Sequence, residues 1–193
     1  MDSVAHGRPR IVVLASGQGT NFQAIIDASE SGRLCGEVVG LISDNPDATA
    51  LRRAKGHGIP RVVVERKSYR SKREFDLGLA EAVKRFSPDL VVLAGFMRLL
   101  GKGFLDEFPE KVINIHPSLL PAFRGLDAQK QALEYGVRYT GCTVHFVDEG
   151  TDTGPIIGQR VVPVMPDDTE DTLRARILVE EHALMIECIN AVL

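Results

Sequence analysis

Short apolar runs rich in β-branched residues alternate along the chain with segments in which apolar residues recur at helical spacing. The apolar runs, which we expect to be strands, cover residues 10–15, 37–43, 61–64, 89–94, 111–116, 140–147 and 156–164. The helical segments cover residues 22–27, 47–57, 71–86, 127–135 and 172–192, with Thr169 as the expected N-cap of the last. This order predicts an α/β fold built on a parallel sheet. The turn-rich segment 148–155 joins two strands directly, which predicts an antiparallel pair at one edge.

A chain of 193 residues is long enough to bury one core and needs no second domain. It contains no internal repeat, low-complexity segment or interdomain linker. We therefore expect a single domain over residues 10–193, preceded by a flexible tail over residues 1–9. Residues 1–10 lack the apolar core of a signal peptide, and no apolar run approaches the ~18 residues of a membrane span.

The strand at 111–116 carries the strongest indication of chemistry. Asn114 and His116 are two residues apart, so a strand places both side chains on one face, and Pro117 ends the strand at His116. Ligands of open α/β sheets bind at the carboxyl ends of strands. An amide and an imidazole that donate to one point would stabilise an oxyanion. Taken singly, a structural histidine and a turn asparagine remain the alternatives.

Two further features accompany this pair. The segment 117–125, rich in proline and apolar residues, is expected to form a shaped wall. Asp152 is the best acidic candidate, because a carboxylate near His116 would fix its tautomer and increase its affinity for a proton. Asp152 can equally be an ordinary turn residue. We expect His145 to be structural, with support of a catalytic residue as the alternative.

A glycine loop at residues 16–21 lies between the first strand and the first helix. Backbone N–H groups at a helix N-terminus favour phosphate. The loop lacks the Gly-Lys-Ser/Thr of a P-loop, and Phe22 stands where a dinucleotide fingerprint needs a small residue. A single phosphomonoester is therefore the better ligand, with a plain glycine turn as the alternative.

Two clusters are ambiguous. The segment 95–100 follows a buried strand and either lines an apolar slot or packs in the core. Four cations precede the helix at 71–86, and they either form a solvated face or contact a carboxylate tail of a ligand. These cations are Lys67, Arg70, Lys72 and Arg73.

Net charge and cysteine content limit the kinds of binding partner and the cellular setting that we expect. A net charge of −3 and a pI near 6.0 provide no basic field for nucleic acid, so the expected partner is a small molecule. Cys35, Cys142 and Cys188 are odd in number and match no metal-ligand spacing. They indicate reduced thiols in the cytoplasm, and we expect them to behave as small buried hydrophobes.

Three motifs together carry a resemblance to a known family. They are residues 114–121 (Asn-Ile-His-Pro-Ser-Leu-Leu-Pro), 141–147 (Gly-Cys-Thr-Val-His-Phe-Val) and 152–155 (Asp-Thr-Gly-Pro). From about Ile11 to Glu187 the chain resembles the phosphoribosylglycinamide formyltransferases, folate-dependent enzymes of purine biosynthesis. The resemblance implies a Rossmann-like formyltransferase fold, in which a mostly parallel seven-stranded sheet has helices on both faces.

The resemblance also implies roles for residues. Asn114, His116 and Asp152 match the catalytic trio of the family. The ribonucleotide substrate would contact Gly17, Gln18, Gly19, Thr20, Asn21 and Glu181. Folate would contact Lys72, Met97, Arg98, Leu99, Leu100, Asn114, Val147, Asp148 and Glu149. The chain stops at Leu193, where relatives usually carry a further short tail, and Asp127 stands where some relatives have histidine, so no role is transferred to it.

The implied reaction transfers the formyl group of 10-formyltetrahydrofolate, as co-substrate and without a metal, to the amine of glycinamide ribonucleotide. The enzyme would be a monomer or a homodimer. One rival is formyltetrahydrofolate hydrolase, and another is the formyltransferase domain that acts on methionyl-tRNA. The tRNA enzyme brings a basic second domain and the hydrolase an N-terminal regulatory domain, neither of which this sequence shows. A non-catalytic phosphosugar-binding module is the third alternative, and it has no use for Asn114, His116 and Asp152 together.

Overall fold

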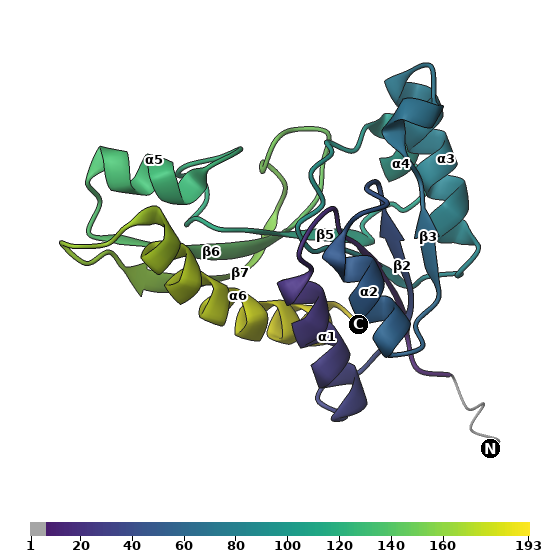
Figure 1. Cartoon of the computed structure of the whole chain (residues 1–193), viewed down its shortest axis with the longest axis horizontal. Helices are drawn as coiled ribbons and strands as arrows, with labels where there is room; N and C mark the ends of the chain where they lie inside the picture. Colours follow the sequence, from purple (N-terminus) through teal and green to yellow (C-terminus); the bar gives the residue numbers. More distant parts are fainter. Residues whose placement is uncertain (1–6) are drawn as a thin grey trace.

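A seven-stranded sheet in the order β3-β2-β1-β4-β5-β6-β7 forms the centre of the computed structural model, which describes residues 7–193 (Figure 1). The strands are β1 (Arg10–Leu14), β2 (Glu37–Ser43), β3 (Arg61–Val63), β4 (Leu90–Leu93), β5 (Val112–His116), β6 (Tyr139–Phe146) and β7 (Ile156–Pro163). The strands from β3 to β5 are parallel, and β6 is antiparallel to both β5 and β7. The mostly parallel sheet and its antiparallel edge are confirmed. The reversal between β5 and β6 was not predicted.

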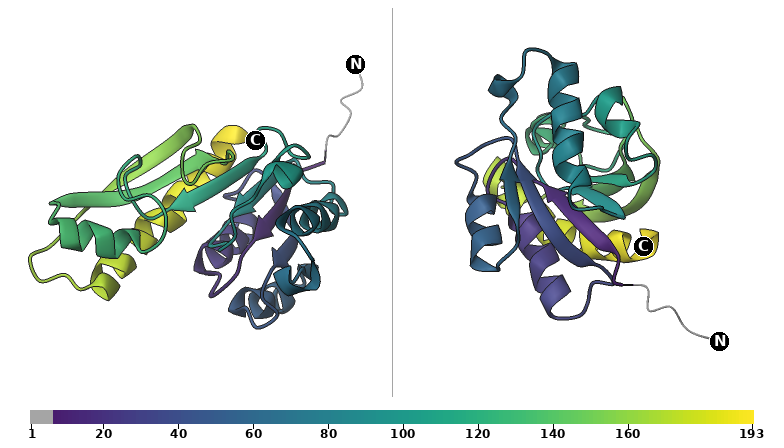
Figure 2. Two further views of the ribbon diagram at one scale, coloured as in Figure 1. Left: turned by 90° about the horizontal axis from the view of Figure 1, so that it is seen from above. Right: turned by 90° about the vertical axis from the view of Figure 1, so that its right-hand side faces the viewer.

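Helices cover both faces of this sheet, as the resemblance implied. They are α1 (Thr20–Glu30), α2 (Thr49–Gly56), α3 (Lys72–Lys84), α4 (Lys102–Leu105), α5 (Ala128–Tyr135) and α6 (Glu170–Val192), with a 3-10 turn at Arg66–Ser68. The two short elements, α4 and the 3-10 turn, were not predicted. Figure 2 shows that the long strands β6 and β7 extend away from the parallel half and that α6 lies along them.

The side chains of β1 show how this sheet builds two cores. Ile11 and Val13 pack with α1, α2 and α6, whereas Val12 and Leu14 pack with α3 and α4 on the other face. All four are fully buried, as the continuous apolar run predicted. The carboxyl ends of β1 and β4 therefore meet, between two helical layers, at the crevice where the strand order reverses.

The structure describes only the last residues of the predicted N-terminal tail. Residues 1–6 lie outside the described residues, and Arg8 donates to the carbonyl oxygens of Leu34 and Gly36 at 2.8 and 2.7 Å.

Two of the three cysteines are buried, as predicted. They are Cys142 and Cys188, and burial raises the pKa of their thiols to about 12 and about 11. The expectation was wrong for Cys35, which is exposed in the connection between α1 and β2.

The predicted cap of the last helix is confirmed. The Thr169 hydroxyl accepts a hydrogen bond from the N–H of Thr172, whose hydroxyl accepts in turn from the N–H of Thr169. Asp168 precedes the cap with a side chain that is only 3% exposed, and both of its oxygens accept from the Arg176 guanidinium at 2.6 and 2.8 Å. These bonds hold the pKa of Asp168 well below its usual range, against the opposing effect of burial. The pair joins the residue before the Thr169 cap to the second turn of α6.

We expect Asp168→Asn to lower Tm at pH 7 by on the order of 5 °C, because the variant loses a bidentate charge-assisted pair. The folded-state pKa of Asp168 is lowered, so its contribution is complete above the ordinary aspartate pKa of about 4 and is lost as pH falls further. The difference between wild type and variant should therefore shrink in thermal scans at pH 3. Asp171→Asn removes an 89% exposed carboxylate of the same turn and should change Tm by no more than about 1 °C. A constant Tm difference at both pH values would contradict this account.

Candidate active site

The glycine loop after β1 forms one wall of a pocket of about 230 Å³. Residues 16–21 line it together with Ala94, Gly95 and Met97, which follow β4. The loop runs directly into α1, whose first N–H groups and positive dipole end favour an anion. The pocket therefore lies at the carboxyl ends of β1 and β4, where the sequence predicted a phosphomonoester.

Gly19 sets the shape of this loop. Its φ of +67° lies in the left-handed region, and α1 begins directly after it at Thr20, earlier than the predicted start at residue 22. A Cβ at Gly19 would lie 2.7 Å from the Cβ of Ala50, the residue whose N–H donates to the carbonyl oxygen of Gly17. The loop thus requires glycine at position 19 for both backbone conformation and space.

Gly19→Ala is expected to lower the free energy of unfolding by about 1–3 kcal/mol, because the new side chain meets both left-handed strain and the α2 backbone. Gly17→Ala is the matched control, since a Cβ there would meet no atom within 4 Å. It should change the free energy by less than about 0.5 kcal/mol. Urea denaturation of both variants measures the difference, and equal stability of the two would refute the assigned role of Gly19.

The side chain of Glu181, which lies on α6, contacts the glycine loop. Glu181 is only 7% exposed, its Oε2 accepts from the Asn21 amide at 2.8 Å, and desolvation raises its pKa against the opposing hydrogen bond. Asn21 Oδ1 accepts no hydrogen bond from a described residue, although this atom is buried and Asn21 lines the pocket. The structure thus brings Glu181 to a residue of the pocket wall from 160 positions away.

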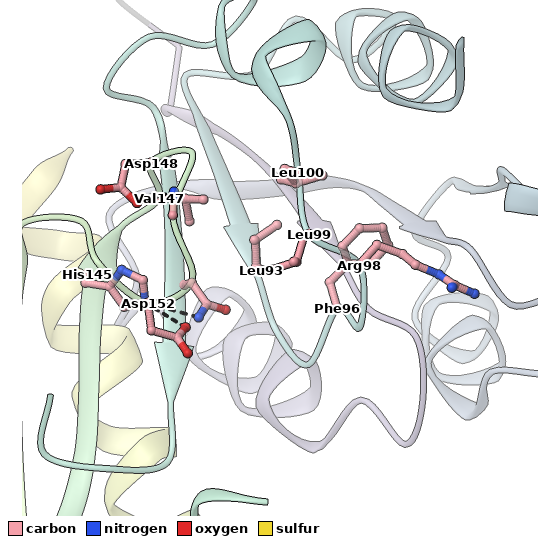
Figure 3. Close-up of a pocket in the computed structure, with 11 residues that line it drawn as sticks. Leu93, Phe96, Arg98, Leu99, Leu100, His145, Val147, Asp148 and Asp152 are labelled. Atoms are coloured by element: carbon pink, nitrogen blue, oxygen red, sulfur yellow. Dashed lines mark hydrogen bonds and ion pairs between the residues drawn. The ribbon is translucent and has the colours of Figure 1, made fainter. Parts of the chain in front are cut away.

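A second cavity of about 90 Å³ lies beside β4 and β5 (Figure 3). Leu93, Leu99 and Leu100 form its apolar side, and Val147 and Asp148 lie opposite them. Its remaining lining residues are Phe96, Arg98, Asn114, His145, Gly150 and Asp152. An apolar slot with a polar end is the lining that a planar heterocycle with hydrogen-bonding edges requires.

Three of the residues predicted to bind folate do not line this cavity. Met97 faces the phosphate pocket, and Glu149 lies in an adjoining open groove that also contacts Val147 and Asp148. Lys72 lies on α3, where its Nζ is 2.8 Å from Asp76 Oδ2. Lys72 is thus paired with Asp76 while its side chain stays half exposed, and its contact with a ligand stays a prediction.

Asp152 connects the polar groups at the end of the cavity. Its Oδ2 lies 3.3 Å from His116 Nδ1 and accepts from the Gly125 N–H at 2.9 Å, and its Oδ1 lies 3.6 Å from His145 Nε2. Burial opposes the charge of Asp152, but the contact with His145, the Gly125 N–H and the charge of His116 outweigh it and lower the pKa. The carboxylate is therefore ionised at neutral pH. The structure brings the predicted trio together, with Asn114 and His116 on β5 and Asp152 on the loop between β6 and β7.

The two ring nitrogens of His116 are both engaged. Nε2 lies 2.8 Å from the carbonyl oxygen of Phe123, an acceptor, so Nε2 carries a hydrogen, and Nδ1 faces Asp152. His116 is only 5% exposed. The predicted wall at 117–125 thus supplies the Phe123 carbonyl to His116 and the Gly125 N–H to Asp152.

His145 belongs to the same cluster. The sequence favoured a purely structural histidine at this position, with support of a catalytic residue as the alternative. It pairs with Asn114 across the antiparallel β5–β6 ladder, and its Nε2 lies 3.2 Å from Asn114 Nδ2. Its Nδ1 donates to the Phe146 carbonyl oxygen at 2.8 Å. The neutral ring can therefore accept the Asn114 hydrogen, whereas the protonated ring faces Asp152. The register that produces this contact could be found only by knowing that β5 and β6 are antiparallel.

The described residues provide neither a cluster of metal ligands nor a membrane-spanning helix. Among residues 7–193, no three His, Cys, Asp or Glu side chains are grouped so as to hold a metal ion. Within the same range, no helix combines the length and the apolar character needed to cross a membrane.

Comparisons with known proteins place the chain among formyl transferases. A family model described as "Formyl transferase" matches residues 9–189. Phosphoribosylglycinamide formyltransferase of Escherichia coli K12 is 43% identical over 174 residues, which are 90% of this chain and 82% of that protein. The crystal structure of glycinamide ribonucleotide transformylase 1 from Symbiobacterium toebii superposes with a TM-score of 0.95 at 50% identity, covering 98% of this chain and 90% of that one.

Longer relatives contain the same region as one part. The trifunctional purine biosynthetic protein adenosine-3 of Drosophila melanogaster is 49% identical over 177 residues, which are 91% of this chain. The chain spans only 13% of that protein's length.

Proposed function

The chain belongs to the phosphoribosylglycinamide formyltransferases of the formyl transferase family, and on that premise we propose that it transfers the formyl group of 10-formyltetrahydrofolate to the amine of glycinamide ribonucleotide. The observation that carries this proposal is that one segment, Gly95–Leu100, lines both hollows. Met97 faces the phosphate pocket, and the next residue, Arg98, lines the apolar cavity. A phosphorylated substrate and a folate bound there would lie side by side.

Each hollow has residues that suit a different one of the two substrates. The phosphate of the ribonucleotide binds the N–H groups of residues 17–21, and Glu181 with Asn21 accepts hydrogens from the polar part beyond it. The pterin of the folate enters between the leucines of the 95–100 segment and Val147, with its reactive end toward Asn114 and Asp152. The chemistry then takes place at the end of the cavity.

We assign the steps as follows. The neutral amine attacks the formyl carbon, a C–N bond forms, and the carbonyl electrons move to oxygen. The Asn114 amide donates to this oxyanion, and His116 supplies a second hydrogen from Nε2 as its contact with Phe123 yields. Asp152 accepts the proton that the attacking nitrogen loses, through a water, and returns it to the folate nitrogen as the C–N bond to folate breaks. The lowered pKa of Asp152 keeps its carboxylate ionised, so its oxygens are free to accept this proton.

A single assay tests the proposed function. Purified protein is mixed with 10-formyltetrahydrofolate and glycinamide ribonucleotide, and formylated ribonucleotide and free formate are quantified in parallel. We expect formylated ribonucleotide with little formate. Formate without transfer would make the protein a formyltetrahydrofolate hydrolase. Turnover of neither kind, with retained binding of the ribonucleotide, would make it a phosphosugar-binding module. Reactions that lack one substrate in turn are the controls.

A further inference from the structure

A buried carboxylate outside the catalytic cluster contacts the walls of both hollows. Asp44 directly follows β2, and its side chain is only 3% exposed. The Ser16 hydroxyl donates to its Oδ1 at 2.5 Å, and Arg98 Nε donates to its Oδ2 at 2.6 Å. Both oxygens of Asp44 are therefore used, and Asp44 lines neither hollow itself.

The two partners of Asp44 belong to different walls. Ser16 begins the loop that lines the phosphate pocket, whereas Arg98 lines the apolar cavity. Figure 3 shows the Arg98 side chain directed away from Asp152, which agrees with its ion pair to Asp44 outside the cavity. The side chain of Asp44, just after β2, thus holds one residue of each wall.

The Ser16 hydroxyl extends this link to the peptide backbone. Its oxygen accepts from the N–H of Met97 at 2.8 Å while its hydrogen goes to Asp44. Because a hydroxyl has only one hydrogen, the acceptor at Asp44 fixes its direction and leaves the lone pairs for Met97. The Ser16 N–H also donates to the carbonyl oxygen of Gly95 at 3.0 Å. The glycine loop and the 95–98 segment are thereby held at a fixed separation.

We infer that Asp44 is a positioning residue that sets the placement of the two substrates relative to each other. The inference rests on the proposed function, since it concerns the distance between the attacking amine and the formyl carbon. That distance must be about 3–3.5 Å for reaction, and a displacement of about 1 Å can cost roughly 100-fold in rate. Loss of the link should leave each hollow able to bind its own ligand while the reacting atoms lose alignment.

The test compares Asp44→Ala, Asp44→Asn and wild type. We expect Asp44→Ala to lower kcat by about 10- to 100-fold, while the Kd values for glycinamide ribonucleotide alone and for tetrahydrofolate alone change less than about threefold. Asp44→Asn retains an acceptor for the Ser16 hydroxyl but turns an amide donor toward Arg98, so its kcat should lie between those of wild type and Asp44→Ala. Asp47→Ala removes an exposed carboxylate three residues along and should leave kcat unchanged.

Several outcomes would overturn the inference. A folded Asp44→Ala protein with wild-type kcat would do so, as would a loss of activity that lies wholly in the two Kd values. An Asp44→Asn kcat as low as that of Asp44→Ala would refute the role of the Ser16 hydroxyl. If Asp44→Ala does not fold, Ser16→Ala breaks the same link and must lower kcat. Absence of transfer by wild type would instead refute the proposed function.

Discussion

Replacing Asp152 by Asn is expected to lower kcat for formyl transfer by about 100- to 10,000-fold, the range over which a positioned acid or base contributes. Asp152 has a φ of +52°, and asparagine tolerates this left-handed backbone as aspartate does, so the variant keeps the loop. What it loses is the charge beside His116 and the proton acceptor. Single-turnover formation of formylated ribonucleotide measures the effect directly.

The pH dependence of this loss distinguishes chemistry from folding. Because the pKa of Asp152 is lowered, the carboxylate is ionised throughout the range from about pH 6 to 8, and the ratio of wild-type to variant kcat should be constant there. Asp171→Asn, at an exposed position on α6, serves as the control and should match wild type. A variant within about threefold of wild type would show that the proton leaves by another route.

Asn114→Ala is expected to lower kcat by about 100- to 1,000-fold, with a smaller change in KM for either substrate. Asn114 is the one amide that lines the apolar cavity, and β5 holds it with His145 opposite. Its hydrogen stabilises an oxygen that is charged only in the transition state, so its loss should appear in kcat. Single-turnover measurements at saturating substrates isolate this step.

Asn114→Asp completes this experiment. The variant has nearly the same shape but presents an acceptor, so we expect a loss at least as large as that of Asn114→Ala. Activity close to wild type in Asn114→Asp would exclude oxyanion stabilisation by this side chain. A loss confined to KM in both variants would assign Asn114 to folate binding alone.

Local patterns predicted much of the fold. The bounds of β2 agree with the prediction at residues 37–43, because an apolar run ends there in turn-forming residues. The cap at Thr169 was predictable for a similar reason, since a hydroxyl before an acidic first turn is a local signal. The single turn α4 was not predictable, because four residues establish no period.

Long-range contacts account for what the sequence did not reveal about the site. The positions of Asn114, His116 and Asp152 were found from residue type, yet the contact of His116 with Phe123 depends on how a loop folds back. Asp44 was not singled out from the sequence, because only the tertiary structure places it against Ser16 and Arg98. Lys72 was singled out as one of a cluster of cations, and only the structure reveals its ion pair with Asp76 one turn along α3.

The antiparallel pairing of β5 with β6 makes the site sensitive to chain length as well as to side-chain identity. Asn114 lies opposite His145, and His116 lies opposite Thr143. One additional residue in β6 before His145 would turn its ring to the other face of the sheet and displace the loop that carries Asp152. Conservative substitutions along β6 can be absorbed by repacking, whereas a single insertion or deletion would dismantle the whole cluster at once. The register of β6 against β5 is thus part of the chemistry.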